Sequence, residues 1–358
     1  MLTYNLEKKS EKTLYMSLYK FIRNDIVDGT IKANEKLPSK RTFAEHLGVS
    51  VITIEYAYRL LSDEGYIYSV ERSGYFVSDL KNILVPKNNE PIKHTYSQVS
   101  TEIDSNFPFY TYSKIARQVL STYGEQLIVK SPHNGCDILR NAISDYLFRY
   151  RGITANTENI VIGSGAEYLY GMIVQLFGRD TVYGLEYPSY EKIRKVYQAN
   201  GATCELLPLD NYGIDTNSLK NTRANIIHVT PYKSYPTGIT APASKRFEYL
   251  SWAKNNNGII IEDDYSSEFT VNSKPVETIF SMDNNNCVIY LNTFSKSLTP
   301  AIRVGYMLLP DNLAEKYKEK LGFYSCTVPV IDQYVLAEFI NSGCFERHLN
   351  KIRRQKKP

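Results

Sequence analysis

Residues 290–305 read YLNTFSKSLTPAIRVG and hold the pattern on which the larger part of the chain depends. An apolar strand runs into a hydroxyl-rich turn with one lysine, Lys296, and a second apolar strand follows at Arg303. Upstream, the apolar run 258–265 ends in carboxylates and a phenol, and Pro236-Thr237-Gly238 follows the strand predicted at 226–229. Open α/β sheets bind ligands at the carboxyl ends of their strands. We therefore expect these polar groups to meet in one site.

The ordered set Pro-Thr-Gly, Asp-x-Tyr, Ser-Lys and Arg-x-Gly resembles the cofactor site of fold-type-I aminotransferases, which use pyridoxal 5'-phosphate (PLP). The resemblance implies that Lys296 supplies the amine that bonds the cofactor. It implies that Asp263 keeps the pyridine nitrogen protonated, so that the ring can take up electrons. The Tyr265 phenol would face the ring oxygen, and Ser295 and Arg303 would hold the phosphate.

The same resemblance adds an aromatic side chain and a phosphate cradle to the expected site. Tyr190 matches the aromatic residue that stacks on the pyridine ring, and Thr293 precedes the Ser-Lys pair. Gly165 and Ala166 lie in a small-residue turn between a predicted strand and a predicted helix. Backbone N–H groups at such a helix start attract anions, so this turn is expected to bind the phosphate.

Length and composition indicate a soluble globular protein of two domains. The chain has 358 residues, of which 43% are hydrophobic and 22% charged. No apolar run approaches the roughly 20 residues of a membrane span, and residues 1–10 lack the apolar core of a signal peptide. The five cysteines are scattered without metal-ligand spacing, which favours reduced thiols in the cytoplasm and no metal site.

Residues 1–80 have the pattern of a winged helix-turn-helix. The spacing of apolar residues and glycines predicts three helices, with Ser39 and Ser50 as caps of the second and third. A turn at 71–74 separates two short predicted strands. The expected elements are helices at 14–28, 39–47 and 51–64 and strands at 66–70 and 75–77.

This segment resembles a GntR-type DNA-binding domain in the stretches KLPSKR at 36–41 and LGVS at 47–50. The resemblance implies that operator DNA is contacted by Ser39, Arg41, Ser50, Thr53 and the wing glycine, Gly74. Two positions depart from the family: Val51 replaces a customary arginine, and Glu55 is acidic near a commonly basic position. Residues 1–80 carry eleven basic and eleven acidic side chains, so their net charge is zero, which is low for a DNA-binding domain. A protein-contact module is therefore the alternative.

The rest of the chain is expected to be a linker followed by an α/β domain. Residues 81–100 are polar and contain prolines, which is typical of a linker. In residues 101–358, predicted strands alternate with helices, which indicates a mostly parallel sheet covered on both faces. The predicted fold is thus an N-terminal winged helix-turn-helix plus a C-terminal α/β domain that resembles the fold-type-I PLP-dependent transferases.

Tyr235 stands where ordinary aminotransferases have an asparagine before Pro-Thr-Gly, and this departure resembles the MocR-type regulators. In that subgroup a GntR domain is fused to an aminotransferase-like domain, and residues 262–269, EDDYSSEF, are similar to its motif. Its usual His-Gln pair is Lys233-Ser234 here. The resemblance implies a homodimeric, PLP-binding transcription regulator that senses an amino acid or amine. The alternatives are an aminotransferase with a DNA-binding appendage and a DNA-binding protein whose second domain only dimerises.

Proteins of this kind continue into a C-terminal small subdomain that carries the arginine for the substrate carboxylate. This chain ends at residues 351–358, KIRRQKKP, after a lead-in that resembles the start of that subdomain. The small subdomain is therefore expected to be absent, as in a fragment. Because a transaminase must clamp its substrate carboxylate, sustained transamination is not expected of the chain as given.

Overall fold

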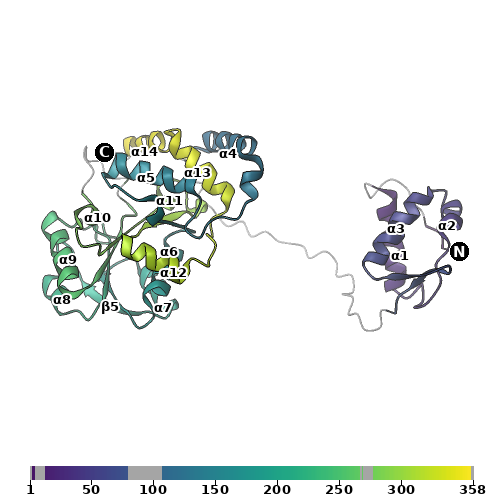
Figure 1. Cartoon of the computed structure of the whole chain (residues 1–358), viewed down its shortest axis with the longest axis horizontal. Helices are drawn as coiled ribbons and strands as arrows, with labels where there is room; N and C mark the ends of the chain where they lie inside the picture. Colours follow the sequence, from purple (N-terminus) through teal and green to yellow (C-terminus); the bar gives the residue numbers. More distant parts are fainter. Residues whose placement is uncertain (1, 5–12, 80–106, 267, 269–276, 356–358) are drawn as a thin grey trace. The chain divides into compact units, whose positions relative to one another are not determined.

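The computed structural model describes residues 2–4, 13–79, 107–266, 268 and 277–355. The chain divides into two compact units, Met1–Thr101 and Glu102–Pro358 (Figure 1). The predicted linker, residues 81–100, lies outside the described residues. No helix in the described part of the chain is both long enough and apolar enough to cross a membrane.

The first unit consists of three helices and a β-hairpin, as the sequence pattern predicts. Both predicted caps are present: the Ser39 hydroxyl accepts from the Thr42 N–H at 3.2 Å, and the Ser50 hydroxyl accepts from the Thr53 N–H at 3.1 Å. Gly48 adopts the left-handed conformation that ends the second helix and starts the turn. The elements are α1 (Leu14–Val27), α2 (Lys40–Leu47), α3 (Val51–Asp63), β1 (Ile67–Val70) and β2 (Gly74–Val77).

The second unit is built around a seven-stranded sheet with the order β3-β9-β8-β7-β6-β4-β5. The pairs from β5 to β8 are parallel, whereas β9 is antiparallel to both neighbours, so the sheet is mostly parallel as predicted. The strands are β3 (Ile160–Gly163), β4 (Val182–Tyr187), β5 (Thr203–Pro208), β6 (Ile226–Val229), β7 (Ile259–Asp263), β8 (Val288–Thr293) and β9 (Gly305–Leu308).

The edge strand β5 was not predicted from the sequence. Its residues alternate irregularly between exposed and half-buried positions, and Leu207 is the one fully buried side chain among them. A strand at the edge of a sheet needs no continuous apolar run, so its sequence lacks the signal that marks the central strands.

Helices cover both faces of the sheet (Figure 1). On one face α6, α7 and α12 pack against inward residues such as Ile261, while the neighbouring residue Ile260 points into the core of the opposite face. The helices are α4 (Phe109–Tyr123), α5 (Asp137–Arg151), α6 (Ala166–Phe177), α7 (Glu191–Ala199), α8 (Thr216–Asn221), α9 (Ala243–Asn256), α10 (Ile279–Met282), α11 (Phe294–Ser297), α12 (Asp311–Leu321), α13 (Val330–Asn341) and α14 (Cys344–Gln355).

The topology brings the predicted site residues to one edge of the sheet. Since β9 runs antiparallel to both β3 and β8, those two strands are parallel to each other, and their carboxyl ends lie with those of β4, β6 and β7. Helices α6 and α11 begin just after β3 and β8 at this edge. Sheet order, and not closeness in sequence, therefore assembles the site.

Candidate cofactor site and DNA-binding face

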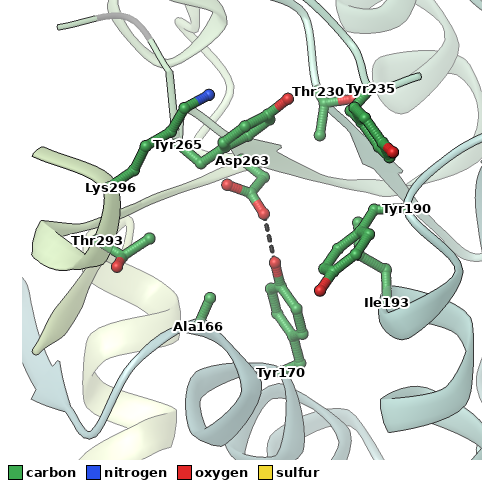
Figure 2. A pocket seen from close by; sticks show the side chains of 10 residues that line it. All are labelled: Ala166, Tyr170, Tyr190, Ile193, Thr230, Tyr235, Asp263, Tyr265, Thr293 and Lys296. Atoms are coloured by element: carbon green, nitrogen blue, oxygen red, sulfur yellow. Dashed lines mark hydrogen bonds between the residues drawn. The ribbon is translucent and has the colours of Figure 1, made fainter. Parts of the chain in front are cut away.

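A cavity of about 380 Å³ opens at the carboxyl edge of the sheet (Figure 2). Six residues predicted to hold the cofactor line it: Ala166, Tyr190, Asp263, Tyr265, Thr293 and Lys296. Four other residues complete the wall: Tyr170, Ile193, Thr230 and Tyr235. Gly165, Ser295 and Arg303 lie next to these residues in the chain or in space but do not line the cavity itself.

Asp263 is buried in the wall of the cavity, and its two carboxylate oxygens differ in their hydrogen bonding. Its Oδ2 accepts a short hydrogen bond from the Tyr170 hydroxyl (Figure 2). The same oxygen lies 3.5 Å from His228 Nε2. Its Oδ1 is buried and has no hydrogen-bond partner among the described residues. An unsatisfied buried carboxylate oxygen is costly. It is therefore an acceptor suited to a ligand N–H, such as that of a protonated pyridine nitrogen.

Tyr170 donates a hydrogen bond to Asp263, and His228 lies beside the same oxygen without bonding to it; neither residue was predicted from the sequence. They lie inside the apolar runs of α6 and β6, where a periodicity argument assigns them to the core. His228 Nδ1 is 3.0 Å from the Tyr197 hydroxyl, which extends the buried network away from the cavity. Burial and the charge of Asp263 raise the pKa of Tyr170 well above its usual value, so the phenol keeps the proton that it donates.

Lys296 and Tyr265 face each other across the mouth of the cavity. The Lys296 Nζ lies 4.5 Å from the centre of the Tyr265 ring, a cation–π distance. The Tyr265 hydroxyl donates to the backbone carbonyl of Lys233 at 3.1 Å. Burial, followed by the charge of Asp263, raises the pKa of Tyr265. The phenol thus stays protonated next to the lysine amine.

The predicted phosphate cradle has a backbone conformation that favours glycine. Gly165 has φ +92°, and a Cβ at this position would come within 2.8 Å of Arg303 Nη2. Arg303 donates to the Ser164 carbonyl at 3.3 Å and lies 3.5 Å from a carboxylate oxygen of Glu167. The guanidinium therefore lies against the turn that starts α6, as a phosphate-binding arginine must.

Thr293 and Ser295 shape the turn that carries Lys296. The Thr293 hydroxyl caps α11 by accepting from the Ser295 N–H at 2.9 Å. Ser295 is half-buried one residue before the lysine. Thr293 therefore both lines the cavity and fixes the position of Lys296, whereas Ser295 contributes here through its backbone.

Two aromatic rings form the outer wall. Tyr190 and Tyr235 meet edge to face with their ring centres 6.2 Å apart. Two unusual residues precede Pro236: Tyr235 lines the cavity, while the Ser234 hydroxyl donates to the buried Glu186 carboxylate at 2.9 Å. Lys233 and Ser234 stand in place of the usual His-Gln pair. Lys233 thus contributes a backbone acceptor for Tyr265, and Ser234 contributes a buried hydrogen bond.

In the first unit, a groove runs between the start of α2, the start of α3 and the wing. Ser39, Arg41 and Gly74 line it, together with Lys36, Lys40, Val51 and Glu55. Ser50 and Thr53 lie at the first turn of α3, where their hydroxyl groups are 2.8 Å apart. Lys40 Nζ forms an ion pair with Glu55 at 2.8 Å. Ser39, Arg41 and Gly74 thus lie together in this groove, whereas Ser50 and Thr53 lie at the start of α3 and do not line it.

No group of three or more histidine, cysteine or acidic side chains in the described ranges could hold a metal ion. The cavity of the second unit brings together an amine, a carboxylate and a phenol, those of Lys296, Asp263 and Tyr265. These groups suit a small carbonyl compound with a basic ring nitrogen and an anionic group.

Two family descriptions match the chain. Residues 14–77 match the gntR family of bacterial regulatory proteins, and residues 124–356 match the class I and II aminotransferases. An HTH-type transcriptional regulator of Bacillus subtilis, YdeL, is 35% identical over 98% of this chain and 78% of its own length. The probable rhizopine catabolism regulatory protein MocR of Rhizobium meliloti is 27% identical over 98% of this chain and 76% of its own length.

Similar solved structures are aminotransferases. A Pyrococcus horikoshii kynurenine aminotransferase has a TM-score of 0.63 and 25% identity, and covers 70% of this chain. An archaeal alanine:glyoxylate aminotransferase has the same TM-score, 24% identity, and covers 69% of this chain. The chain spans 64% of the length of each of them. The likeness of the second unit to these enzymes is one of fold.

Proposed function

The chain belongs to the MocR-type transcription regulators, in which a GntR helix-turn-helix is joined to an aminotransferase-like unit, and we propose that its second unit binds PLP through Lys296. The observation that carries the proposal is the cavity in which Lys296 and the unsatisfied Oδ1 of Asp263 lie together. When bound, PLP supplies an aldehyde that combines with amines and a ring that takes up electrons.

Four side chains at the site have distinct parts in this proposal. Asp263 accepts a hydrogen bond from the ring nitrogen, and its charge keeps the proton there. Tyr190 covers one face of the ring, and Tyr265 orients the lysine amine. Arg303 and the N–H groups at the start of α6, beside Gly165 and Ala166, hold the phosphate.

We further propose that an amino acid or amine reaching this cavity acts as the effector, and that the winged helix of a homodimer binds operator DNA in the cytoplasm. Relatives that span both units are named as transcriptional regulators, which favours regulation over the alternative of an aminotransferase with a DNA-binding appendage. The basic groove of the first unit favours DNA over a protein partner, because phosphate contacts supply most of the affinity for nucleic acid.

Borohydride reduction tests the proposed attachment of PLP. The purified full chain is incubated with PLP, reduced, digested and mapped by mass spectrometry. A pyridoxyl group on the peptide that contains Lys296, absent from Lys296→Ala, is the expected result. Lys233→Ala is the matched control, since Lys233 lies close to Tyr265 yet contributes its backbone carbonyl. A pyridoxyl group on another lysine, or none, contradicts the proposal.

A further inference from the structure

Two large apolar side chains are exposed on the first turn of α3. Val51 is 42% exposed and Ile52 is 63% exposed. The buried face of the same helix is formed by other residues: Ile54, Ala57, Tyr58 and Leu61. Val51 and Ile52 therefore do not complete the core of the first unit, and their methyl groups can contact a partner.

The position of these two residues in the fold indicates what that partner is. In helix-turn-helix proteins the second helix of the motif lies in the major groove, and its N-terminal residues contact the edges of the bases. Here that helix is α3, and the Ser50 cap fixes where it begins. Val51 also lines the groove between α2, α3 and the wing, so it lies where a base edge would approach.

The charges around the two side chains favour DNA over an apolar protein surface. Lys36 and Arg41 line the same groove, and neither forms an ion pair with another residue that the structure describes. Lys40 neutralises Glu55, the acidic residue of the exposed helix face, and this contact lowers the pKa of Glu55. Val51 thus lies in a groove with cationic groups that suit phosphates, and Ile52 follows it on the same turn of α3.

We propose that Val51 and Ile52 read thymine methyl groups in the operator. The major-groove edges of guanine, cytosine and adenine present hydrogen-bonding groups, and thymine alone adds a methyl group. A valine or isoleucine can form no hydrogen bond, so it would leave a guanine or cytosine edge unsatisfied. The inference rests on the proposed binding of operator DNA and specifies the base that the start of α3 selects.

The test removes single methyl groups from the DNA. The full chain is used to select its preferred duplex from a random pool, and each thymine of that duplex is then replaced by deoxyuridine, which differs only in lacking the methyl. One or two replacements in each half-site are expected to weaken binding about fourfold each, the value of one buried methyl or methylene. Replacements at other thymines should leave the affinity unchanged.

Variants of the protein connect that loss to the two side chains. Val51→Ser and Ile52→Ser should each bind the thymine duplex more weakly and should each abolish the effect of one uracil replacement. Val27→Ser, which changes an exposed valine at the end of α1, should leave every uracil effect in place. The reading of thymine methyl groups by Val51 and Ile52 is wrong if deoxyuridine weakens binding equally in the wild type and both α3 variants. It is also wrong if deoxyuridine has no effect on the wild type, and in both cases the proposed DNA binding itself stands. If the wild-type chain selects no duplex, the proposed DNA binding itself is wrong, and the apolar face is then a protein contact.

Discussion

The two units place their functional side chains in opposite settings. In the winged helix, Ser39, Arg41 and Ser50 are exposed and come from one short stretch of chain. In the aminotransferase-like unit, Asp263 is buried, and it meets Tyr170 from a helix far upstream. Local sequence thus forms the first site, whereas the order of strands in the sheet forms the second. Substitutions at the first site should alter one contact at a time, and substitutions at the second should disturb a coupled network.

The largest expected effect is that of Asp263→Asn on PLP affinity. Asparagine keeps the size of the side chain but removes the charge that faces the ring nitrogen, and breaking a buried charge pair costs about 3–5 kcal/mol. PLP binding, followed by its visible absorption, should weaken by at least about a hundredfold. Asp180→Asn, at an exposed position, is the control. Unchanged affinity in Asp263→Asn would show that this carboxylate does not face the bound ring.

The next largest effect is a pH dependence of the stability of the second unit, which contains the buried carboxyl group of Glu268. Burial, followed by the nearby Asp264, raises the pKa of Glu268 from 4.5 to about 7. The folded state therefore holds a proton that the unfolded state releases, and stability falls as pH rises from about 4.5 to about 7. Glu268→Gln should remove this loss and stabilise the unit at pH 8 by up to about 3 kcal/mol.

Denaturant unfolding of this variant at pH 4 and at pH 8 measures the effect. The gain should shrink toward pH 4, where the wild-type carboxyl is protonated in both states. Glu319→Gln, at an exposed position of α12, should change the stability little at either pH. A gain for Glu268→Gln that is equal at both pH values would mean that packing, and not the ionisation of Glu268, is responsible.

In the exposed groove of the winged helix, we expect a substitution to remove a single contact with DNA. Arg41→Ala should weaken binding of a selected operator by about 1–3 kcal/mol if the arginine contacts a base. Arg59→Ala removes an equal charge from the later part of α3, where the guanidinium stacks on Tyr56 at 4.6 Å. Gel-shift titrations at two salt concentrations distinguish the loss of a base contact from the loss of a phosphate contact, because only a phosphate contact contributes to the salt dependence of binding. Equal losses for both arginines would mean that Arg41 contributes charge alone.

The smallest predicted effect concerns the support of Asp263. Tyr170→Phe removes the hydrogen bond to Oδ2 and should weaken PLP binding about threefold to tenfold, because the bond is lost from both the free and the loaded protein and only part of its energy affects the affinity. It should also shift the absorption maximum of bound PLP. Tyr183→Phe is a close match, because Tyr183 is buried with a hydroxyl that bonds to no described residue. Similar behaviour of the two variants would show that Tyr170 serves packing alone.

This contrast also explains what the sequence could predict. The caps Ser39 and Ser50 were predicted correctly because a cap depends on residues three positions away. The placement of Lys296 and Asp263 at one edge followed from the carboxyl ends of apolar strands. Tyr170 and His228 could not be found in this way, since a buried polar residue within an apolar run shows its partner only once the strand order is known. The edge strand β5 escaped prediction for lack of an apolar run.

If an amine in the cavity is the effector, its binding changes the affinity of the winged helix for DNA. DNA affinity of the full chain, loaded with PLP and titrated with each amino acid and a series of primary amines, tests it most directly. At least one amine should change the affinity for DNA about fivefold or more, which is the lower range of allosteric coupling. The Lys296→Ala variant should still bind DNA but should not respond to that amine. A chain that carries PLP on Lys296 yet binds DNA with the same affinity in the presence of every amine would contradict the account.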